Sequence, residues 1–305
     1  MGAFIVELAG TPAGDALAVA LALLSALAHA IFGAINKGGR DPIINRGAIN
    51  IAYALFALPA ALFLVPLPTP RLWWIIGGAF FIHLLYEWLQ ARAFQTGGFT
   101  VVYPIARGTG PLLIALFAGA VFDEPFGPGQ WGGLLLLTGA IYGLAVANLR
   151  LLGLADLAAA KQLRLAITFA LATGAMIAVY TLYDAWGIRE AADPISFILW
   201  HFVTGAFGTP VVAALRWRRL TPEQRPEVPE LALRGFFGGL IALMSFGGIM
   251  LGTRLGNVAE VAAIRETSIV FATAIGVLIF HERLDALRLG LIMLIAAGAI
   301  IIKVA

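Results

Sequence analysis

The chain has 305 residues, of which 61% are hydrophobic and 12% are charged, and its mean hydropathy is +0.92. These values exclude an ordinary soluble domain and predict an integral membrane protein whose surroundings are a lipid bilayer. The formal net charge is +3, but the basic residues lie in loops between apolar stretches, where they determine topology, so no nucleic-acid partner is expected.

Ten apolar stretches are long enough to cross a bilayer core, which takes about 20 helical residues. The breaks at Gly97-Gly98 and Gly256-Asn257 are placed from glycine and turn chemistry. The fold class is therefore all-α and membrane-embedded, with ten transmembrane helices. These spans, numbered 1 to 10 in chain order, are expected at 16–37, 46–67, 72–95, 99–122, 129–148, 165–187, 195–215, 234–256, 258–280 and 286–304.

One pattern occurs twice in the sequence, at a constant offset of 158 residues. Five identities in register within apolar segments indicate a duplication. Each copy holds five spans, an odd number, so the second copy enters the membrane in the opposite orientation, as an inverted repeat. The predicted domains are a first repeat at 16–148, a linker at 149–164 and a second repeat at 165–304. The matching elements are Arg107-x-Thr109, Phe122-x-Glu124 and Gly132 in the first copy and Arg265-x-Thr267, Phe280-x-Glu282 and Gly290 in the second.

Most Lys and Arg residues fall in the loops between spans 1 and 2, 5 and 6, 7 and 8, and 9 and 10. Short cytoplasmic loops are enriched in these residues. These four loops are therefore predicted to be cytoplasmic, with both termini outside. The predicted location is the plasma membrane, and in a bacterium the inner membrane.

The ten spans in two five-helix halves, and the repeated Phe-x-Glu and Gly elements, resemble the drug/metabolite transporter superfamily, in its EamA type. The resemblance covers nearly the whole chain and implies secondary transport of substrates such as amino acids, nucleotide sugars or drugs. The chain departs from the family in two respects. The glycine that often precedes the Glu is Asp123 in one half and His281 in the other. Family members are commonly described with cytoplasmic termini, opposite to the charge distribution here.

Two arginines lie deep within spans, Arg107 about 12 Å into span 4 and Arg265 about 10 Å into span 9. A charge at the centre of a membrane helix costs on the order of 2.5–3.5 kcal/mol, so each needs a partner or water. Each is expected either to form a structural ion pair or to bind a carboxylate or phosphate of a substrate. Pro104 and Pro111 flank Arg107 and weaken span 4 there, as a packing kink or as the wall of a cavity.

Glu87 in span 3 is the deepest carboxyl group. It can pair structurally with an arginine such as Arg107, bind a substrate ammonium, or exchange a proton that is coupled to transport. Glu266 follows Arg265 and on a regular helix points about 100° away from it. One of these two is therefore expected to serve helix packing or another partner. Glu124 and Glu282 are expected to orient the turns into spans 5 and 10.

Aromatic residues and histidines complete the candidate substrate-binding set. Tyr180 and Tyr183 share a helix face. Each of these residues either packs in the core or lines a cavity for an apolar or aromatic side chain. No metal is expected, because the histidines lack metal-ligand spacing. No cofactor and no enzymatic activity are expected, because phosphate loops, nucleophile elbows and zinc-protease patterns are missing from the sequence. The set is Tyr86, Tyr103, Tyr180, Tyr183, Trp88, Trp200, His29 and His83.

The predicted function is secondary-active transport of small metabolites by alternating access. Arginines for a carboxylate, an acid for an ammonium and aromatic walls together suit amino acids with apolar or aromatic side chains. Export of such amino acids is the favoured hypothesis, with or without proton coupling through Glu87. Efflux of organic cations or drugs is the alternative, ahead of a passive channel or a membrane enzyme. The expected partners are a small-molecule substrate and the bilayer; the oligomeric state stays open, and a monomer is compatible with the sequence.

Overall fold

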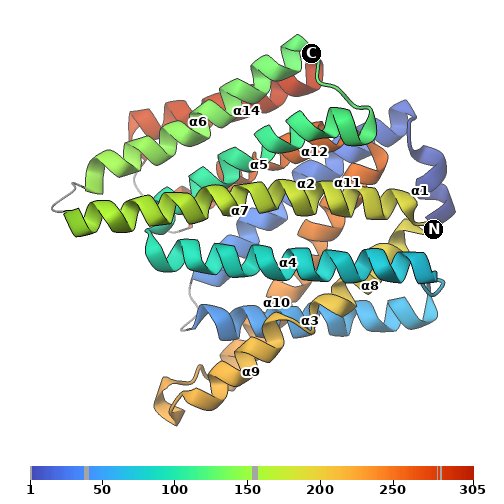
Figure 1. Cartoon of the computed structure of the whole chain (residues 1–305), viewed down its shortest axis with the longest axis horizontal. Coiled ribbons are helices and arrows are strands. Elements are labelled where there is room, and N and C mark those ends of the chain that lie inside the picture. The colour runs from blue at the N-terminus through green and yellow to red at the C-terminus, as the bar shows by residue number, and fades with distance from the viewer. Residues whose placement is uncertain (1, 38–40, 153–156, 280, 282–283) are drawn as a thin grey trace. The chain divides into compact units, whose positions relative to one another are not determined.

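The computed structural model describes residues 2–37, 41–152, 157–279, 281 and 284–305. Every regular element within these ranges is a helix (Figure 1). The predicted Phe280-x-Glu282 element has both its named residues outside them. The elements are α1 (Gly2–Leu8), α2 (Pro12–Lys37), α3 (Pro42–Phe63), α4 (Pro70–Thr96), α5 (Phe99–Phe122), α6 (Pro128–Leu152), α7 (Leu157–Glu190), α8 (Pro194–Gly205), α9 (Thr209–Arg219), η1 (Pro222–Gln224), α10 (Val228–Ala242), η2 (Leu243–Gly247), α11 (Gly248–Leu255), α12 (Val258–Arg265), α13 (Ser268–Leu278) and α14 (Ala286–Val304).

Ten candidate membrane spans are present in the described part of the chain, which confirms the predicted all-α membrane fold. The predicted breaks at Gly97-Gly98 and Gly256-Asn257 separate α4 from α5 and α11 from α12. The spans run over residues 12–35, 42–63, 70–96, 101–122, 128–149, 160–190, 194–219, 222–255, 258–278 and 286–304.

Span 2 begins at Pro42, earlier than the expected residue 46, because a polar cap fixes its start. The Asp41 carboxylate accepts hydrogen bonds from the backbone N–H groups of Ile43 (3.1 Å) and Ile44 (3.2 Å), which satisfies two of the free donors at a helix N-terminus. Arg216 of α9 forms an ion pair with the same carboxylate. Apolar periodicity carries no information about such a cap.

Spans 7, 8 and 9 are interrupted, which the sequence analysis did not predict. Span 7 breaks between α8 and α9, just before Pro210. Span 8 contains η2, a single π-helical turn, and span 9 breaks at Glu266 and Thr267, between α12 and α13. In secondary transporters, interrupted helices commonly lie at substrate and ion sites.

Span 4 is continuous although the sequence predicted a weak point between Pro104 and Pro111. Close packing against α7 explains this difference. A Cβ atom added at Gly174 of α7 would lie 2.4 Å from the Cβ of Thr109, so the two helices touch directly at this glycine. Gly110 of α5 also lies against α7, where an added Cβ would be 2.8 Å from the Ile177 side chain. These contacts stabilise α5 as one continuous helix across both prolines.

The helices form two compact units. Unit 1 comprises Met1–Phe81 and Asp184–Gly256, and unit 2 comprises Ile82–Tyr183 and Asn257–Ala305. Each unit takes helices from both halves of the sequence, so the compact units are not the predicted repeats. The repeat boundaries at 16–148 and 165–304 stay a prediction, because repeats are defined by ancestry and compact units by contacts.

In unit 1, small residues bring α2 and α3 against the interrupted span 8. Gly239 of α10 lies on the backbone of α3, where an added Cβ would be 2.9 Å from the Tyr53 nitrogen. Ser25 of α2 donates a 2.6 Å hydrogen bond to the carbonyl of Ser245 in η2, and the Ser245 hydroxyl donates to the Ser25 carbonyl at 3.3 Å. Close backbone approach and buried hydroxyl bonds of this kind are typical of membrane helix packing.

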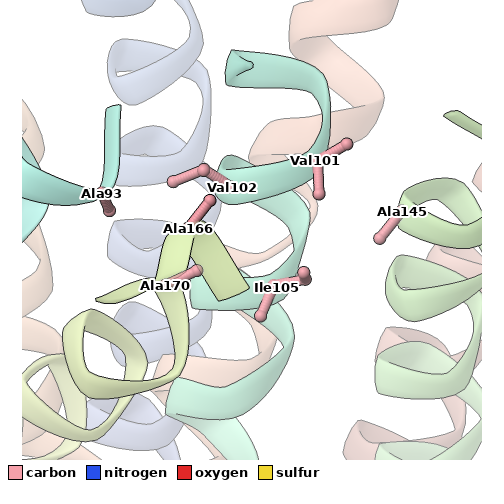
Figure 2. Packing of buried hydrophobic residues seen from close by; sticks show 7 residues of the cluster. All are labelled: Ala93, Val101, Val102, Ile105, Ala145, Ala166 and Ala170. Atoms are coloured by element: carbon pink, nitrogen blue, oxygen red, sulfur yellow. The ribbon is translucent and has the colours of Figure 1, made fainter. Parts of the chain in front are cut away.

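In unit 2, a cluster of small buried residues joins the ends of α4 and α7 to α5 and α6 (Figure 2). In the same unit, α6 runs alongside α14 (Figure 1). A Cβ at Gly133 of α6 would lie 2.8 Å from the Gly298 carbonyl, and a Cβ at Gly298 of α14 would lie 2.7 Å from the Gly133 carbonyl. The two helices are therefore in backbone contact. The clustered residues are Ala93, Val101, Val102, Ile105, Ala145, Ala166 and Ala170.

Among the described residues, the non-glycine positions with positive φ are Asp123 (58°) and His281 (56°). They are separated by 158 positions, the offset of the repeated pattern. Glycine is the residue best suited to this left-handed conformation, which explains why a glycine is expected before the repeated Glu. Shared backbone geometry at equivalent positions supports the predicted duplication.

Candidate functional site

The buried charges of unit 2 meet where span 9 is interrupted. Arg107 comes from α5, Arg265 is the last residue of α12, and Glu266 follows it in the break. All three side chains are buried, with exposed fractions of 5%, 5% and 3%. We name Arg107, Arg265, Glu266, Ser268 and Tyr103 the arginine cluster.

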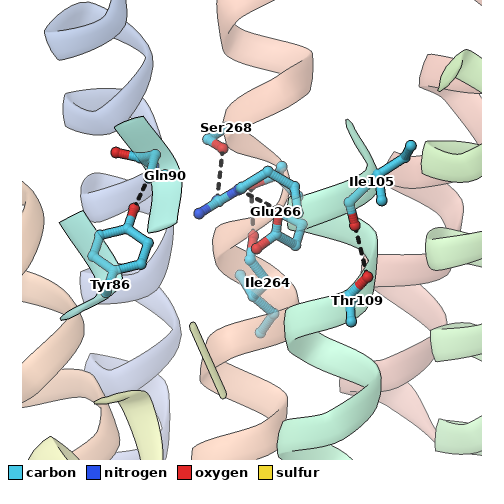
Figure 3. Close-up of polar contacts among 9 residues, drawn as sticks. Tyr86, Gln90, Ile105, Thr109, Ile264, Glu266 and Ser268 are labelled. Atoms are coloured by element: carbon cyan, nitrogen blue, oxygen red, sulfur yellow. Dashed lines mark hydrogen bonds and ion pairs between the residues drawn. The ribbon is translucent and has the colours of Figure 1, made fainter. Parts of the chain in front are cut away.

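Arg107 makes three contacts within the arginine cluster. Its Nε lies 2.9 Å from Oε2 of Glu266, which makes a close ion pair. Its Nη2 donates a hydrogen bond to the Ser268 hydroxyl at 3.3 Å (Figure 3). The Tyr103 ring lies one helical turn earlier on α5, with its centroid 6.0 Å from the guanidinium carbon, close enough for a cation–π interaction. The guanidinium is thus held at its edge and at its face.

Arg265 belongs to the same electrostatic environment. It is attracted by Glu266 and repelled by Arg107. A cation in the last turn of α12 and an anion just before α13 both suit the dipoles of those helices. The interruption of span 9 therefore stabilises adjacent opposite charges within this span. Glu266 is engaged by Arg107, and the expectation that one of Arg265 and Glu266 serves helix packing or another partner stays a prediction.

Short-range hydrogen bonds define the break itself. The N–H groups of Glu266 and Thr267 donate to the carbonyls of Ala263 and Ile264, both at 3.0 Å. The Thr267 hydroxyl also donates to the Ile264 carbonyl at 2.7 Å. These are bonds over three residues, as in a 3₁₀ turn, which has poorer hydrogen-bond geometry than an α-helix and often marks a hinge in mid-helix.

Aromatic rings from α4 and α7 form a wall beside the arginine cluster. Tyr180 lies 4.6 Å from the His83 ring and 4.9 Å from the Tyr86 ring, measured between centroids. Tyr180 clusters with Ala106, the residue before Arg107 on α5, and Tyr86 packs against this cluster. The Tyr86 hydroxyl accepts a 2.6 Å hydrogen bond from Gln90 (Figure 3). We name His83, Tyr86 and Tyr180 the aromatic wall.

The structure thus brings together Arg107, Arg265, Tyr103 and the aromatic wall, all of which the sequence analysis selected. Glu87 and Tyr183 belong to the same unit and are half-buried. The ion-pair partner of Arg107 is Glu266. The binding roles of these residues, and proton coupling through Glu87, stay predictions.

Three other selected residues lie elsewhere. Trp88 is 53% exposed and packs against Phe169, with Arg92 above its ring. Trp200 and His29 belong to unit 1, where Trp200 packs edge-on against Trp73 and His29 stacks on Phe32. The part of these three residues in substrate binding stays a prediction.

Glu124, expected to orient the turn into span 5, also contacts the start of span 9. Its carboxylate accepts a 2.8 Å hydrogen bond from the backbone N–H of Val258, the first residue of α12. A carboxylate at a helix N-terminus satisfies a free donor and suits the helix dipole. Glu124 therefore fixes the start of α12, and with it the depth of Arg265.

The sequence analysis missed Glu266 and Ser268 as members of the site. The repeat contained a signal for both, since 158 residues earlier their counterparts are Gly108 and Gly110. Those glycines pack against Tyr142 and α7, whereas the polar residues of the second copy both contact Arg107. The arginine cluster thus combines the repeated arginines Arg107 and Arg265 with two polar residues, Glu266 and Ser268, at positions where the copies differ.

Residues 164–304 match the family model of the EamA-like transporter family. The match covers most of the second half of the chain and none of residues 1–163. The EamA family is part of the drug/metabolite transporter superfamily, so the resemblance drawn from the sequence is confirmed. EamA proteins are transporters, which agrees with the predicted transport function and with a multi-pass membrane protein that handles a small-molecule substrate.

One solved crystal structure, described only as that of a protein, has a TM-score of 0.73 to this chain. The match covers 96% of this chain and 98% of the other, at 17% sequence identity. At this identity the likeness concerns the fold alone. No curated protein matches the chain.

Proposed function

We propose that this EamA-domain protein is a secondary-active transporter that exports amino acids with apolar or aromatic side chains by alternating access. The observation that carries the proposal is the arginine cluster. Buried arginines recognise carboxylates with good geometry, because a guanidinium offers parallel N–H donors. The aromatic wall beside it offers a surface for an apolar or aromatic side chain.

Charge balance supports an anionic group on the substrate. Within the described residues of unit 2, the arginine cluster contains two arginines and one glutamate, a formal charge of +1. Of the other acidic residues that the structure describes in this unit, all but Glu87 are engaged elsewhere or exposed. A substrate carboxylate is attracted by a cluster of net positive formal charge, whereas a simple organic cation is repelled. Those other residues are Glu124 on Val258, Glu260 on Lys303, Asp285 on Arg288, and exposed Asp123.

Alternating access follows from the proposed inverted repeat, because two related halves facing opposite sides can exchange conformations. The shared positive φ at Asp123 and His281 supports the duplication. We assign the hinges for such an exchange to the interruptions of spans 7, 8 and 9. Glu87, half-buried on α4 next to Tyr86, stays our candidate for binding the substrate ammonium or a coupling proton.

The alternative is efflux of organic cations, and the aromatic wall is the observation that favours it. Electron-rich rings bind quaternary ammonium groups through cation–π interactions. The net positive charge of the arginine cluster weighs against this reading, so we place it second.

Counterflow in proteoliposomes tests the proposed function. Vesicles loaded with L-phenylalanine are expected to accumulate external labelled L-phenylalanine faster than unloaded vesicles, because a carrier exchanges substrate across the membrane. Tetraphenylphosphonium loading is expected to have no such effect, and a pH gradient tests for proton coupling. Stimulation by the cation alone would support the alternative, and flux that follows voltage without counterflow would indicate a channel.

The charge distribution leads us to propose that both termini lie outside, in the plasma membrane. A green fluorescent protein fused to the C-terminus is then expected to stay dark in a bacterial host, because it does not mature after export to the periplasm in unfolded form. Alkaline phosphatase fused at the same position is expected to be active. The reverse result would place the C-terminus in the cytoplasm, as is common in the resembling family.

A further inference from the structure

We infer that Glu266 is a tethered carboxylate that occupies the anion subsite of Arg107 until the carboxylate of the substrate takes its place. The inference rests on the proposed function and adds to it a specificity-determining residue and a substrate chemistry, a free carboxylate. Three features of the arginine cluster support it: the unused donors of Arg107, the different anchoring of the two partners, and the difference between the two sequence repeats.

Arg107 has capacity for a second carboxylate. A guanidinium carries five N–H donors. In the described part of the chain, its Nε faces Glu266 and one Nη2 hydrogen faces Ser268. The contact with Glu266 is made at Nε, and neither this nitrogen nor Oε2 of Glu266 meets hydrogen-bond geometry, so it is weaker than the two parallel bonds that Arg can form with a carboxylate. A substrate carboxylate with two-point contact would compete well with it.

The two partners differ in how firmly they are held. Arg107 is on a continuous helix that touches α7 at Gly110 and Gly174. Glu266 is in the interruption of span 9, whose hydrogen bonds span only three residues. A small rotation in this turn moves the Glu266 carboxylate without disturbing α5. The glutamate is thus the movable member of the pair, and the arginine is the fixed one.

The repeat indicates that this contact is an addition to the basic fold. In the first copy the positions equivalent to Glu266 and Ser268 are Gly108 and Gly110, which serve helix packing. Only the second copy places polar groups there, and both contact Arg107. If the residue at position 107 served packing alone, an apolar residue of similar volume would often be as stable as a buried ion pair. Such a residue would need neither a carboxylate nor a hydroxyl beside it.

Binding of L-phenylalanine to the purified protein in lipid nanodiscs tests the inference. Glu266→Gln is nearly isosteric and removes the competing charge, so the dissociation constant is expected to fall by about tenfold, the scale of one charge-assisted hydrogen bond. Glu260→Gln is the matched control, because Glu260 is also on span 9 but pairs with Lys303. It is expected to bind as the unaltered protein does. Phenylalaninamide, which lacks the carboxylate, is expected to bind neither variant tightly.

Infrared difference spectra give a second readout that does not depend on affinity. Addition of L-phenylalanine is expected to shift a protein carboxylate band, because Glu266 changes its partner. The shift should vanish in Glu266→Gln and persist in Glu260→Gln. Binding and transport of L-phenylalanine without this shift, or with equal or weaker affinity in Glu266→Gln, would overturn the inference and leave the proposed function intact. A protein that binds phenylalaninamide but no free carboxylate would overturn both.

Discussion

Arg107→Ala is expected to abolish L-phenylalanine counterflow and to lower the free energy of unfolding by about 3–5 kcal/mol, because it leaves Glu266 buried without its close ion-pair partner. Thermal unfolding in detergent micelles, followed by circular dichroism, measures the stability change. The exposed pair Arg71–Glu190 offers a control, with 71% of the Arg71 side chain accessible. Arg71→Ala is expected to cost about 0–1 kcal/mol.

The double variant Arg107→Ala/Glu266→Ala separates binding from stability. It removes both charges of the pair, so it is expected to be more stable than the sum of the single changes by about 1–3 kcal/mol. Transport is expected to stay lost, because the anion subsite is gone. A double variant that transports L-phenylalanine at the rate of the unaltered protein would show that Arg107 only pairs with Glu266.

Gly133→Ala is expected to lower the free energy of unfolding by about 1–3 kcal/mol, the usual cost of overpacking a close contact. The added methyl group would lie 2.8 Å from the Gly298 carbonyl and 2.9 Å from the Ile302 nitrogen. Both are backbone atoms of α14, so relief requires the two helices to move apart. Thermal unfolding in micelles again provides the measurement.

The neighbouring glycine of α6 is the matched control. Gly132 has no atom within 4 Å of an added Cβ, so Gly132→Ala is expected to be neutral or to stabilise by up to about 1 kcal/mol through helix propensity. Equal destabilisation by both changes would contradict the proposed contact between α6 and α14. An added Cβ at Gly290 also has no atom within 4 Å. The repeated glycines, Gly132 and Gly290, are therefore not the ones that join α6 and α14.

The sequence was sufficient to predict the spans and the depth of the buried charges. Hydropathy along the sequence locates each span, and the distance of a residue from the end of its span gives its depth in the membrane. By this measure Arg107 and Arg265 lie near the middle of their spans. The glycine-rich junctions at Gly98 and Gly256 were found because turn chemistry is local. Direction around a helix is harder to predict, which is why Trp88 proved to be an exposed residue.

Partner choice could not be predicted in the same way. Glu266 was identified as a buried acid in span 9, but its partner Arg107 lies on another span, which helix periodicity does not predict. The reasoning about Pro104 and Pro111 considered the propensity of span 4 alone, and packing against α7 overrides it. Both differences arise from contacts between segments distant in sequence. A comparison of the two repeats at residues 108 and 266 would have identified the unusual glutamate.

The π-helical turn η2 changes the helical register of the eighth span. A π turn holds one residue more than an α turn, so η2 (Leu243–Gly247) absorbs the equivalent of a single-residue insertion. Side chains beyond it are rotated by about 100° from where an unbroken helix would carry them. Heptad or helical-wheel assignments made before η2 therefore cannot be extended to Thr253 and Arg254, and homologues that lack the turn will show a one-residue gap here.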